Sequence, residues 1–113
     1  MAHLRTTQLD GVAVLRLDGA LGHAEVVEVE RAFRDATAAA GAAMVIDLSG
    51  VNFLGTAGIA LLLEAAQTLK RAGGKVVVGG AQPRVAEVLK RLRLERVLPI
   101  TQTVEAGVAL AKP

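Results

Sequence analysis

Residues 52–58, with the sequence NFLGTAG, separate two apolar segments whose periodicities differ. The segment before them, residues 43–48, is almost continuously apolar, which is typical of a strand covered on both faces. In the segment after them, apolar side chains recur at helical spacing from Ile59 onward. One strand therefore ends near this junction and a helix begins in it, with Thr56 at the start of that helix.

Two short strands and a helix are predicted before the junction. Residues 3–9 and 12–18 are the strands, and the Asp-Gly pair at 10–11 is a strong signal for a hairpin turn between them. Residues 19–22 interrupt the strand pattern, and residues 24–40 then show helical spacing. The side chains expected on the buried face of this helix are Val26, Val29, Phe33 and Ala36.

Strand and helix signals also alternate after the junction. The glycines at 73–74 end the helix that begins near Thr56, and residues 75–80 form a further buried strand. A helix then starts near Pro83, and residues 97–100 are a short edge strand because they contain a proline. A closing helix follows from Thr103 to Ala111. The apolar residues expected to be buried in the first two of these helices are Ile59, Leu62, Leu63, Ala66, Leu69, Val85, Val88, Leu89 and Leu92.

This order of elements predicts an α/β fold. Strand–helix–strand crossovers make neighbouring strands parallel, whereas a hairpin is antiparallel. We therefore expect a mixed β-sheet, an N-terminal hairpin plus parallel strands, with about four helices packed on it. A length of 113 residues fits one domain, residues 1–113, and a hydrophobic share of 52% is sufficient for a core.

The composition argues against several classes of function. The chain has no Cys, which excludes disulfides, thiolate metal sites and cysteine nucleophiles. A net charge of +2 and the absence of Trp and Tyr argue against direct binding of nucleic acid. No apolar run approaches the roughly 18 residues that span a bilayer, and the N-terminus lacks the apolar core of a signal peptide. We therefore expect a cytoplasmic protein with no membrane span.

No pattern of residues predicts catalysis, a metal or a cofactor. The sequence shows no nucleophile paired with a general base and no pair of catalytic carboxylates, so we expect that the protein is not an enzyme. His3 and His23 are isolated from carboxylates, which predicts no metal site. The glycine-rich residues 73–80 lack the spacing and the Ser/Thr of a phosphate-binding loop. Asp47 and Ser49 are interpreted as turn residues at a strand end.

Three segments together resemble the STAS domain family of bacterial anti-sigma factor antagonists and their relatives. They are LRLDGALGHAEVVEVE (residues 15–30), VIDLSGVNFLGTAGIALLL (residues 45–63) and RAGGKVVVGGAQPRVAEVLKRLRLERVLPI (residues 71–100). The family pattern has Asp-Ser-Ser/Thr-Gly at the start of a helix, a Gly-Gly turn, a Val-rich strand and a helix that begins at proline. The resemblance covers nearly the whole chain in order.

The resemblance implies a function in binding another protein. In such proteins the first hydroxyl residue after the Asp is phosphorylated by an anti-sigma factor of the serine/threonine kinase type. The unmodified form binds that anti-sigma factor and releases a sigma factor, and this position is Thr56 here. A homodimer is compatible with this interpretation. The residues that the resemblance assigns to partner binding are Gly22, His23, Gly55, Thr56, Ala57 and Gly58.

The chain departs from the family pattern at three positions. Gly55 replaces the Asp, Ala57 replaces the second hydroxyl residue, and Gly22 stands where an acidic residue is usual. Two acids near the switch are therefore missing. The alternative function is a STAS subunit that does not switch, in a larger assembly such as a stress-signalling scaffold or a lipid-transport complex.

Thr56 has two interpretations that the residues leave open. As an N-cap, its hydroxyl would accept a hydrogen bond from the N–H of Gly58 or Ile59, which stabilises a helix by about 1 kcal/mol. As a phosphoacceptor, it would carry nearly two negative charges at the positive end of a helix. Gly55 and Gly58 are interpreted as residues that permit a tight turn, with Gly55 also exposing the loop to a partner.

Overall fold

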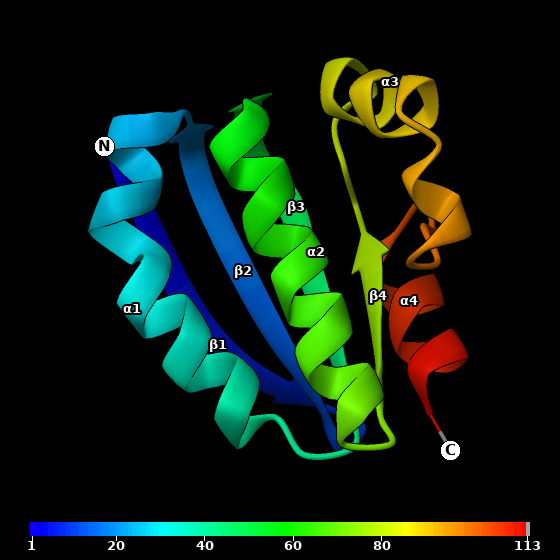
Figure 1. The fold of residues 1–113 in the computed structure, drawn as a ribbon. Helices are drawn as coiled ribbons and strands as arrows, with labels where there is room; N and C mark the ends of the chain where they lie inside the picture. The colour runs from blue at the N-terminus through cyan, green and yellow to red at the C-terminus, as the bar shows by residue number, and fades with distance from the viewer. Residues whose placement is uncertain (113) are drawn as a thin grey trace.

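A computed structural model describes residues 1–112 of the chain, and Figure 1 shows its fold. After an initial pair of strands, helices and strands alternate as predicted as far as residue 91. The elements are β1 (Ala2–Leu9), β2 (Val12–Leu21), α1 (His23–Ala39), β3 (Ala43–Leu54), α2 (Thr56–Arg71), β4 (Lys75–Gly79), α3 (Pro83–Arg91), the 3₁₀ helix η1 (Leu94–Arg96) and α4 (Val104–Ala111).

The strands form one mixed sheet in the order β1-β2-β3-β4. β1 pairs antiparallel with β2, whereas β2 with β3 and β3 with β4 are parallel pairs. The hairpin turn lies at Asp10 and Gly11, whose φ angles of 53° and 80° are those that a two-residue Asp-Gly turn requires. The predicted sheet, with its N-terminal hairpin and parallel strands, is confirmed.

The helices cover the two faces of the sheet unequally. α1 and α2 lie side by side on one face (Figure 1), where they cover side chains such as Leu15 of β2 and Ile46 of β3. α4 packs on the other face against Val45 and Val77. Because successive side chains of a strand point to opposite faces, β3 is buried on both sides, which explains its continuous apolar sequence.

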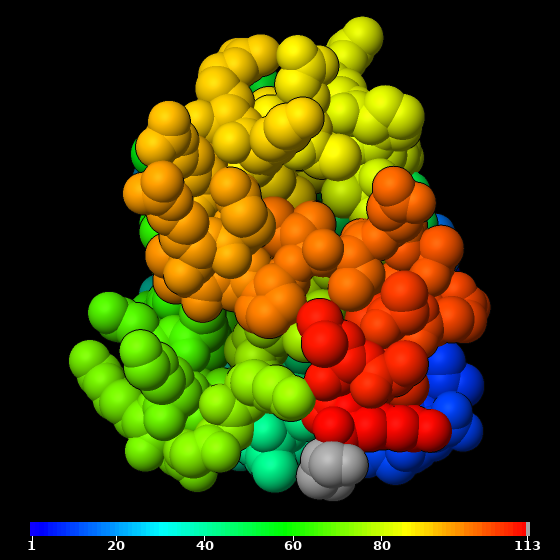
Figure 2. Space-filling view, turned by 90° about the vertical axis from the view of Figure 1, so that its right-hand side faces the viewer, coloured from blue at the N-terminus to red at the C-terminus, as the bar shows by residue number. Residues whose placement is uncertain are grey.

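The edge strand predicted for residues 97–100 is wrong. The chain forms η1 and then only one bridge, between Ile100 and Val78 of β4. The N–H of Val78 donates to the carbonyl of Pro99 (2.9 Å), and the N–H of Thr101 donates to the carbonyl of Val78 (2.8 Å). In Figure 2 this segment, in orange, covers the middle of one side of the molecule between α3 in yellow and α4 in red.

Two strands are longer than the sequence predicts. β2 continues through the expected break at residues 19–22 as far as Leu21, and β3 continues from residue 48 to Leu54. Two irregularities in the β2–β3 register absorb the extra residues, and Gly19 has a φ angle of +99° there. Bulges of this kind let a strand continue through residues that alone indicate a break.

The buried face of α2 differs from the predicted face, because it includes residues on the side of the helix that points toward α1. Leu61 and Ala65 are buried, whereas Ile59, Leu63 and Ala66 are only partly buried. Leu61 and Ala65 line the seam between α2 and α1, so the neighbouring helix covers them. Periodicity predicts that a helix has an apolar stripe but does not show which elements flank it.

Smaller corrections concern α1 and α3. Thr37 rather than Ala36 is buried in α1, because its hydroxyl donates to the carbonyl of Phe33 (2.8 Å) and so leaves no unsatisfied polar group. Leu92 is exposed, because α3 ends one residue before it, and Val88 is partly buried. Within residues 1–112, none of the helices combines the length and the hydropathy that a bilayer crossing needs.

Candidate protein-docking site

The two loops singled out in the sequence lie next to each other at one end of the sheet. The N–H of Gly55 donates to the carbonyl of Leu21 (3.0 Å), which extends the parallel pairing of β2 and β3 by one step. The carboxyl ends of parallel strands meet at the same edge of a sheet, so the starts of α1 and α2 are also neighbours. The structure therefore brings Gly22 and His23 close to Gly55 and the residues after it.

The N-cap of α2 is Gly55, not Thr56. Gly55 has an extended backbone (φ −90°, ψ −178°), and its carbonyl accepts the first helical hydrogen bond from the N–H of Ile59 (3.0 Å). Thr56 is the first helical residue, its side chain is exposed, and no side chain caps this helix. The prediction that Thr56 caps the helix is wrong, because the helix already includes Thr56 and the capping residue is the one before it.

The first turn of α2 has no acidic side chain of its own to offset the partial positive charge of the helix N-terminus. The first turn of α2 contains no Asp or Glu, whereas the first turn of α1 contains Glu25. A helix N-terminus has unpaired N–H groups and a partial positive charge, and it stabilises an anion placed there. A phosphate on the Thr56 hydroxyl would lie at this end of the helix.

The six predicted partner-binding residues differ in exposure. His23 and Thr56 are exposed, and Gly22, Gly55 and Ala57 are partly exposed. Gly58 is buried, and a Cβ atom there would lie 2.8 Å from Cδ1 of Leu54 and 3.0 Å from Cβ of Leu21. Gly58 therefore lets α2 pack closely on the strand ends, and the tight turn expected at this residue is wrong because it lies within the helix.

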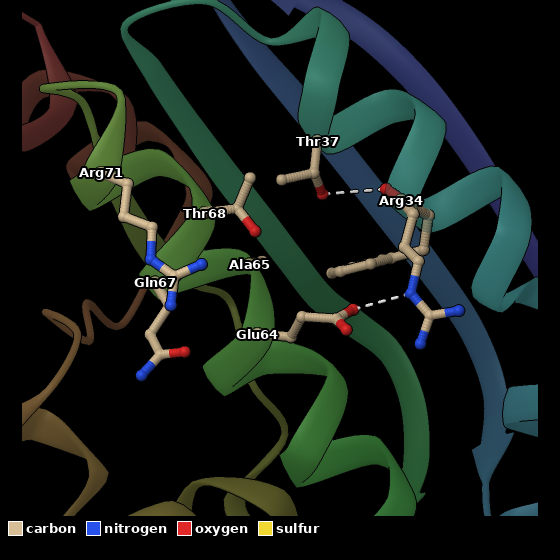
Figure 3. A pocket seen from close by; sticks show the side chains of 8 residues that line it. Arg34, Thr37, Glu64, Ala65, Gln67, Thr68 and Arg71 are labelled. Carbon is tan, nitrogen blue, oxygen red and sulfur yellow. Dashed lines mark hydrogen bonds and ion pairs between the residues drawn. The ribbon is translucent and has the colours of Figure 1, made fainter.

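A seam between α1 and α2 runs away from this site. The Nε of Arg34 in α1 donates to Oε2 of Glu64 in α2 at 2.9 Å, as Figure 3 shows. This hydrogen bond and the charge of Glu64 raise the pKa of the Arg34 guanidinium above its ordinary value. The ion pair divides the seam in two, and the half nearer the site is lined by His23, Val26, Val27, Glu30, Ala57, Ala60 and Leu61.

Sequence reasoning missed two exposed apolar side chains near the site. Phe53, at the end of β3, is 54% exposed, and Val27, in the second turn of α1, is 58% exposed. The sequence contains one signal for Phe53, because an aromatic residue immediately before a loop that is expected to bind a protein is a candidate contact. The sequence contains no such signal for Val27, because it lies between Val26 and Val29, two buried valines of the same helix.

Asp47 and Ser49 lie within β3, so the turn expected there is wrong. Oδ1 of Asp47 accepts a hydrogen bond from the N–H of Ser49 (2.9 Å), which is a local contact inside the strand. Oδ2 of Asp47 lies 3.9 Å from a guanidinium nitrogen of Arg16. The Nε of Arg16 donates a hydrogen bond to Oδ1 of Asp18 (2.9 Å). The bond to Asp18 raises the pKa of the Arg16 guanidinium, and this network lies on the face of the sheet opposite α1 and α2.

His3 is on the edge strand β1, where it pairs with Asp18 of β2, and His23 begins α1. Among the residues that the structure describes, no three His, Asp or Glu side chains come together as they would around a metal ion.

Comparison with known families identifies the fold. A model of the STAS domain family matches residues 3–107 of the chain. This chain belongs to the STAS domain family. The resemblance noted in its sequence is confirmed, and its four-stranded mixed sheet with four helices is the fold of other STAS domains, including SpoIIAA.

Similar proteins include several STAS regulators. A Bordetella bronchiseptica protein named as the anti-sigma factor antagonist BtrV is 24% identical over 109 residues, which cover 96% of this chain and 94% of BtrV. An anti-sigma factor antagonist from Mycobacterium paratuberculosis superposes with a TM-score of 0.90 at 24% identity, covering 100% of this chain and 96% of that one. The Bacillus cell fate determinant SpoIIAA, solved in its phosphorylated form, superposes with a TM-score of 0.69 at 18% identity. The match covers 96% of this chain and 99% of the SpoIIAA chain.

Proposed function

We propose that this protein is an anti-sigma factor antagonist. It docks to an anti-sigma factor of the serine/threonine kinase type and thereby releases a sigma factor. The docking surface is the start of α2 together with Gly22 and His23. The observation that carries the proposal is the position of the exposed Thr56 side chain. It lies at a helix start whose first turn lacks acidic residues, beside the loop that contains Gly22. The names of BtrV and of the M. paratuberculosis protein support the same function.

Phosphorylation of Thr56 would act by changing the charge of this surface. A phosphate adds nearly two negative charges, and the α2 N-terminus stabilises them without any rearrangement of the fold. A partner that is complementary to the unmodified surface would then have to desolvate a dianion at the contact. Release of the anti-sigma factor follows from that cost. SpoIIAA, a relative in fold, has itself been solved in a phosphorylated form.

Replacing Thr56 by Glu tests the role of charge at this position. We expect at least tenfold weaker binding to a purified kinase-type anti-sigma factor from the same organism, measured by calorimetry. The melting temperature should not fall, because the side chain is exposed and a helix N-terminus favours a negative charge. Thr68→Glu is a matched control, since it makes the same change at an exposed threonine farther along α2. Equal affinity of Thr56→Glu and the native protein would contradict the switch.

Intact mass spectrometry of the protein from its own host tests phosphorylation directly. We expect a phosphatase-sensitive mass increase that fragment mapping places on Thr56 and that Thr56→Ala removes. Absence of phosphate in both growing and stressed cells would contradict the switch.

The second candidate function is a STAS subunit that does not switch. The glycines at 22 and 55 favour it, because a surface without those acids differs from the pattern of the phosphorylated relatives. A stable stoichiometric complex with scaffold or transporter subunits in affinity purification would support it. A kinase-fold partner that competes with a sigma factor would support the first function instead.

A further inference from the structure

The ring of Phe53 lies over the two glycines that distinguish the docking site. A Cβ atom at Gly55 would lie 3.1 Å from Cε2 of Phe53 and 3.4 Å from its Cζ. A Cβ atom at Gly22 would lie 3.7 Å from the same Cε2 atom. The ring therefore borders both loops, and any side chain at Gly55 would push against it.

The glycines also leave the ring uncovered. Phe53 is 54% exposed, whereas Phe33, the other aromatic residue of the chain, is 1% exposed in the core. The space beside Gly22 is taken by the Glu25 carboxylate, 2.8 Å from the position of a Cβ atom. No acidic side chain is present in the first turn of α2.

The backbone limits how far this ring can move. Phe53 belongs to β3 and is paired with Ala20 of β2, so its Cα atom is held by the sheet. An aromatic ring on a rigid strand loses little conformational entropy when a partner covers it, and aromatic residues are frequent hot spots of protein interfaces. The ring is continuous with the Thr56 helix start, so one partner would cover both.

We propose that Phe53 is the apolar anchor of the docking surface and that the anti-sigma factor receives its ring in an uncharged apolar pocket. The inference rests on the proposed function and specifies the chemistry of the partner. Position 55 and the first turn of α2 have no acid, so no carboxylate from these residues lies beside the exposed ring, and an apolar pocket is the complement of the ring. Thr56 lies next to this contact, so a phosphate there would place a dianion at the rim of the pocket.

Substitution of Phe53 by Ala and by Leu tests the anchor. Against a purified kinase-type anti-sigma factor from the same organism, we expect Phe53→Ala to bind at least twentyfold more weakly. Phe53→Leu keeps most of the apolar volume and should bind within about tenfold of the native protein, because swaps between apolar side chains of similar volume have a small cost. Leu110→Ala, a truncation of a 47% exposed side chain on α4, is the control and should bind as the native protein does.

The outcomes separate the anchor from the proposed function. If the native protein binds no anti-sigma factor, the proposed function fails. If the native protein binds and Phe53→Ala binds equally well, only the anchor is overturned. A second copy of this chain is the other possible partner of the ring, and sedimentation of the free proteins tests it. If the native protein is a dimer that Phe53→Ala converts to a monomer, and binding to the anti-sigma factor is unchanged, the ring contacts a second copy and the proposal is overturned.

Discussion

Replacing Leu62 by Asp should abolish cooperative folding. The Leu62 side chain is 0% exposed and belongs to the core between α2 and the sheet. Removing a buried leucine side chain costs about 3–5 kcal/mol, and an unpaired carboxylate at the same place adds several more. The sum is comparable with the whole free energy of unfolding of a typical domain, about 5–15 kcal/mol. Circular dichroism during heating should show no cooperative transition.

The matched control for Leu62→Asp is Gln67→Asp, which adds the same charge to an exposed position of the same helix. We expect its melting temperature to change by only a few degrees, since surface substitutions usually alter stability by less than about 0.5 kcal/mol. A soluble Leu62→Asp protein that melts cooperatively near the native temperature would show that this face of α2 is not in the core.

Replacing Gly58 by Ala should lower the free energy of unfolding by about 1–3 kcal/mol, the usual cost of overpacking. The added methyl group would overlap with Leu54 and with the backbone of Leu21, whose carbonyl oxygen would be 3.1 Å away. Alanine is a better helix former than glycine by up to about 1 kcal/mol, which offsets only part of that cost. Urea denaturation monitored by circular dichroism measures the change.

Gly107→Ala is the comparison for Gly58→Ala, because both residues are buried helical glycines. The nearest atoms to a Cβ at Gly107 belong to the side chains of Thr101, Val45 and Val77, at 3.1 Å or more. Side chains can adjust where backbone cannot, so we expect the stability to stay within about 1 kcal/mol of native, since the gain in helix propensity offsets mild crowding. A Gly58→Ala protein as stable as the native one would contradict the close packing at α2.

The order and type of most elements could be predicted because periodicity is a local property of the chain. The hairpin at Asp10 and Gly11, the buried strand from residue 43 and the helix before Gly73 all follow from spacing and turn residues. The proximity of the loops at Gly22 and Gly55 also follows, because parallel neighbouring strands end at the same edge.

The details that the sequence did not predict depend on backbone pairing between distant segments. β3 continues past Ser49 because β2 pairs with it through two irregularities, and no local signal reports that pairing. The helix starts at Thr56 because the carbonyl of Gly55 already accepts a helical hydrogen bond. A threonine beside a glycine is compatible with either position, so residue type alone could not place the cap.

Local spacing along this chain therefore determines which segments become strands and helices, the order in which they meet, and the membership of Thr56 in a helix start. The exposure of Phe53 above two glycines, the rotation of the buried face of α2 toward α1, and the Arg34–Glu64 pair between residues 30 positions apart are properties of the assembled fold. The physical reason is that a side chain is buried or exposed by whichever elements pack beside it. Those elements come from distant parts of the sequence.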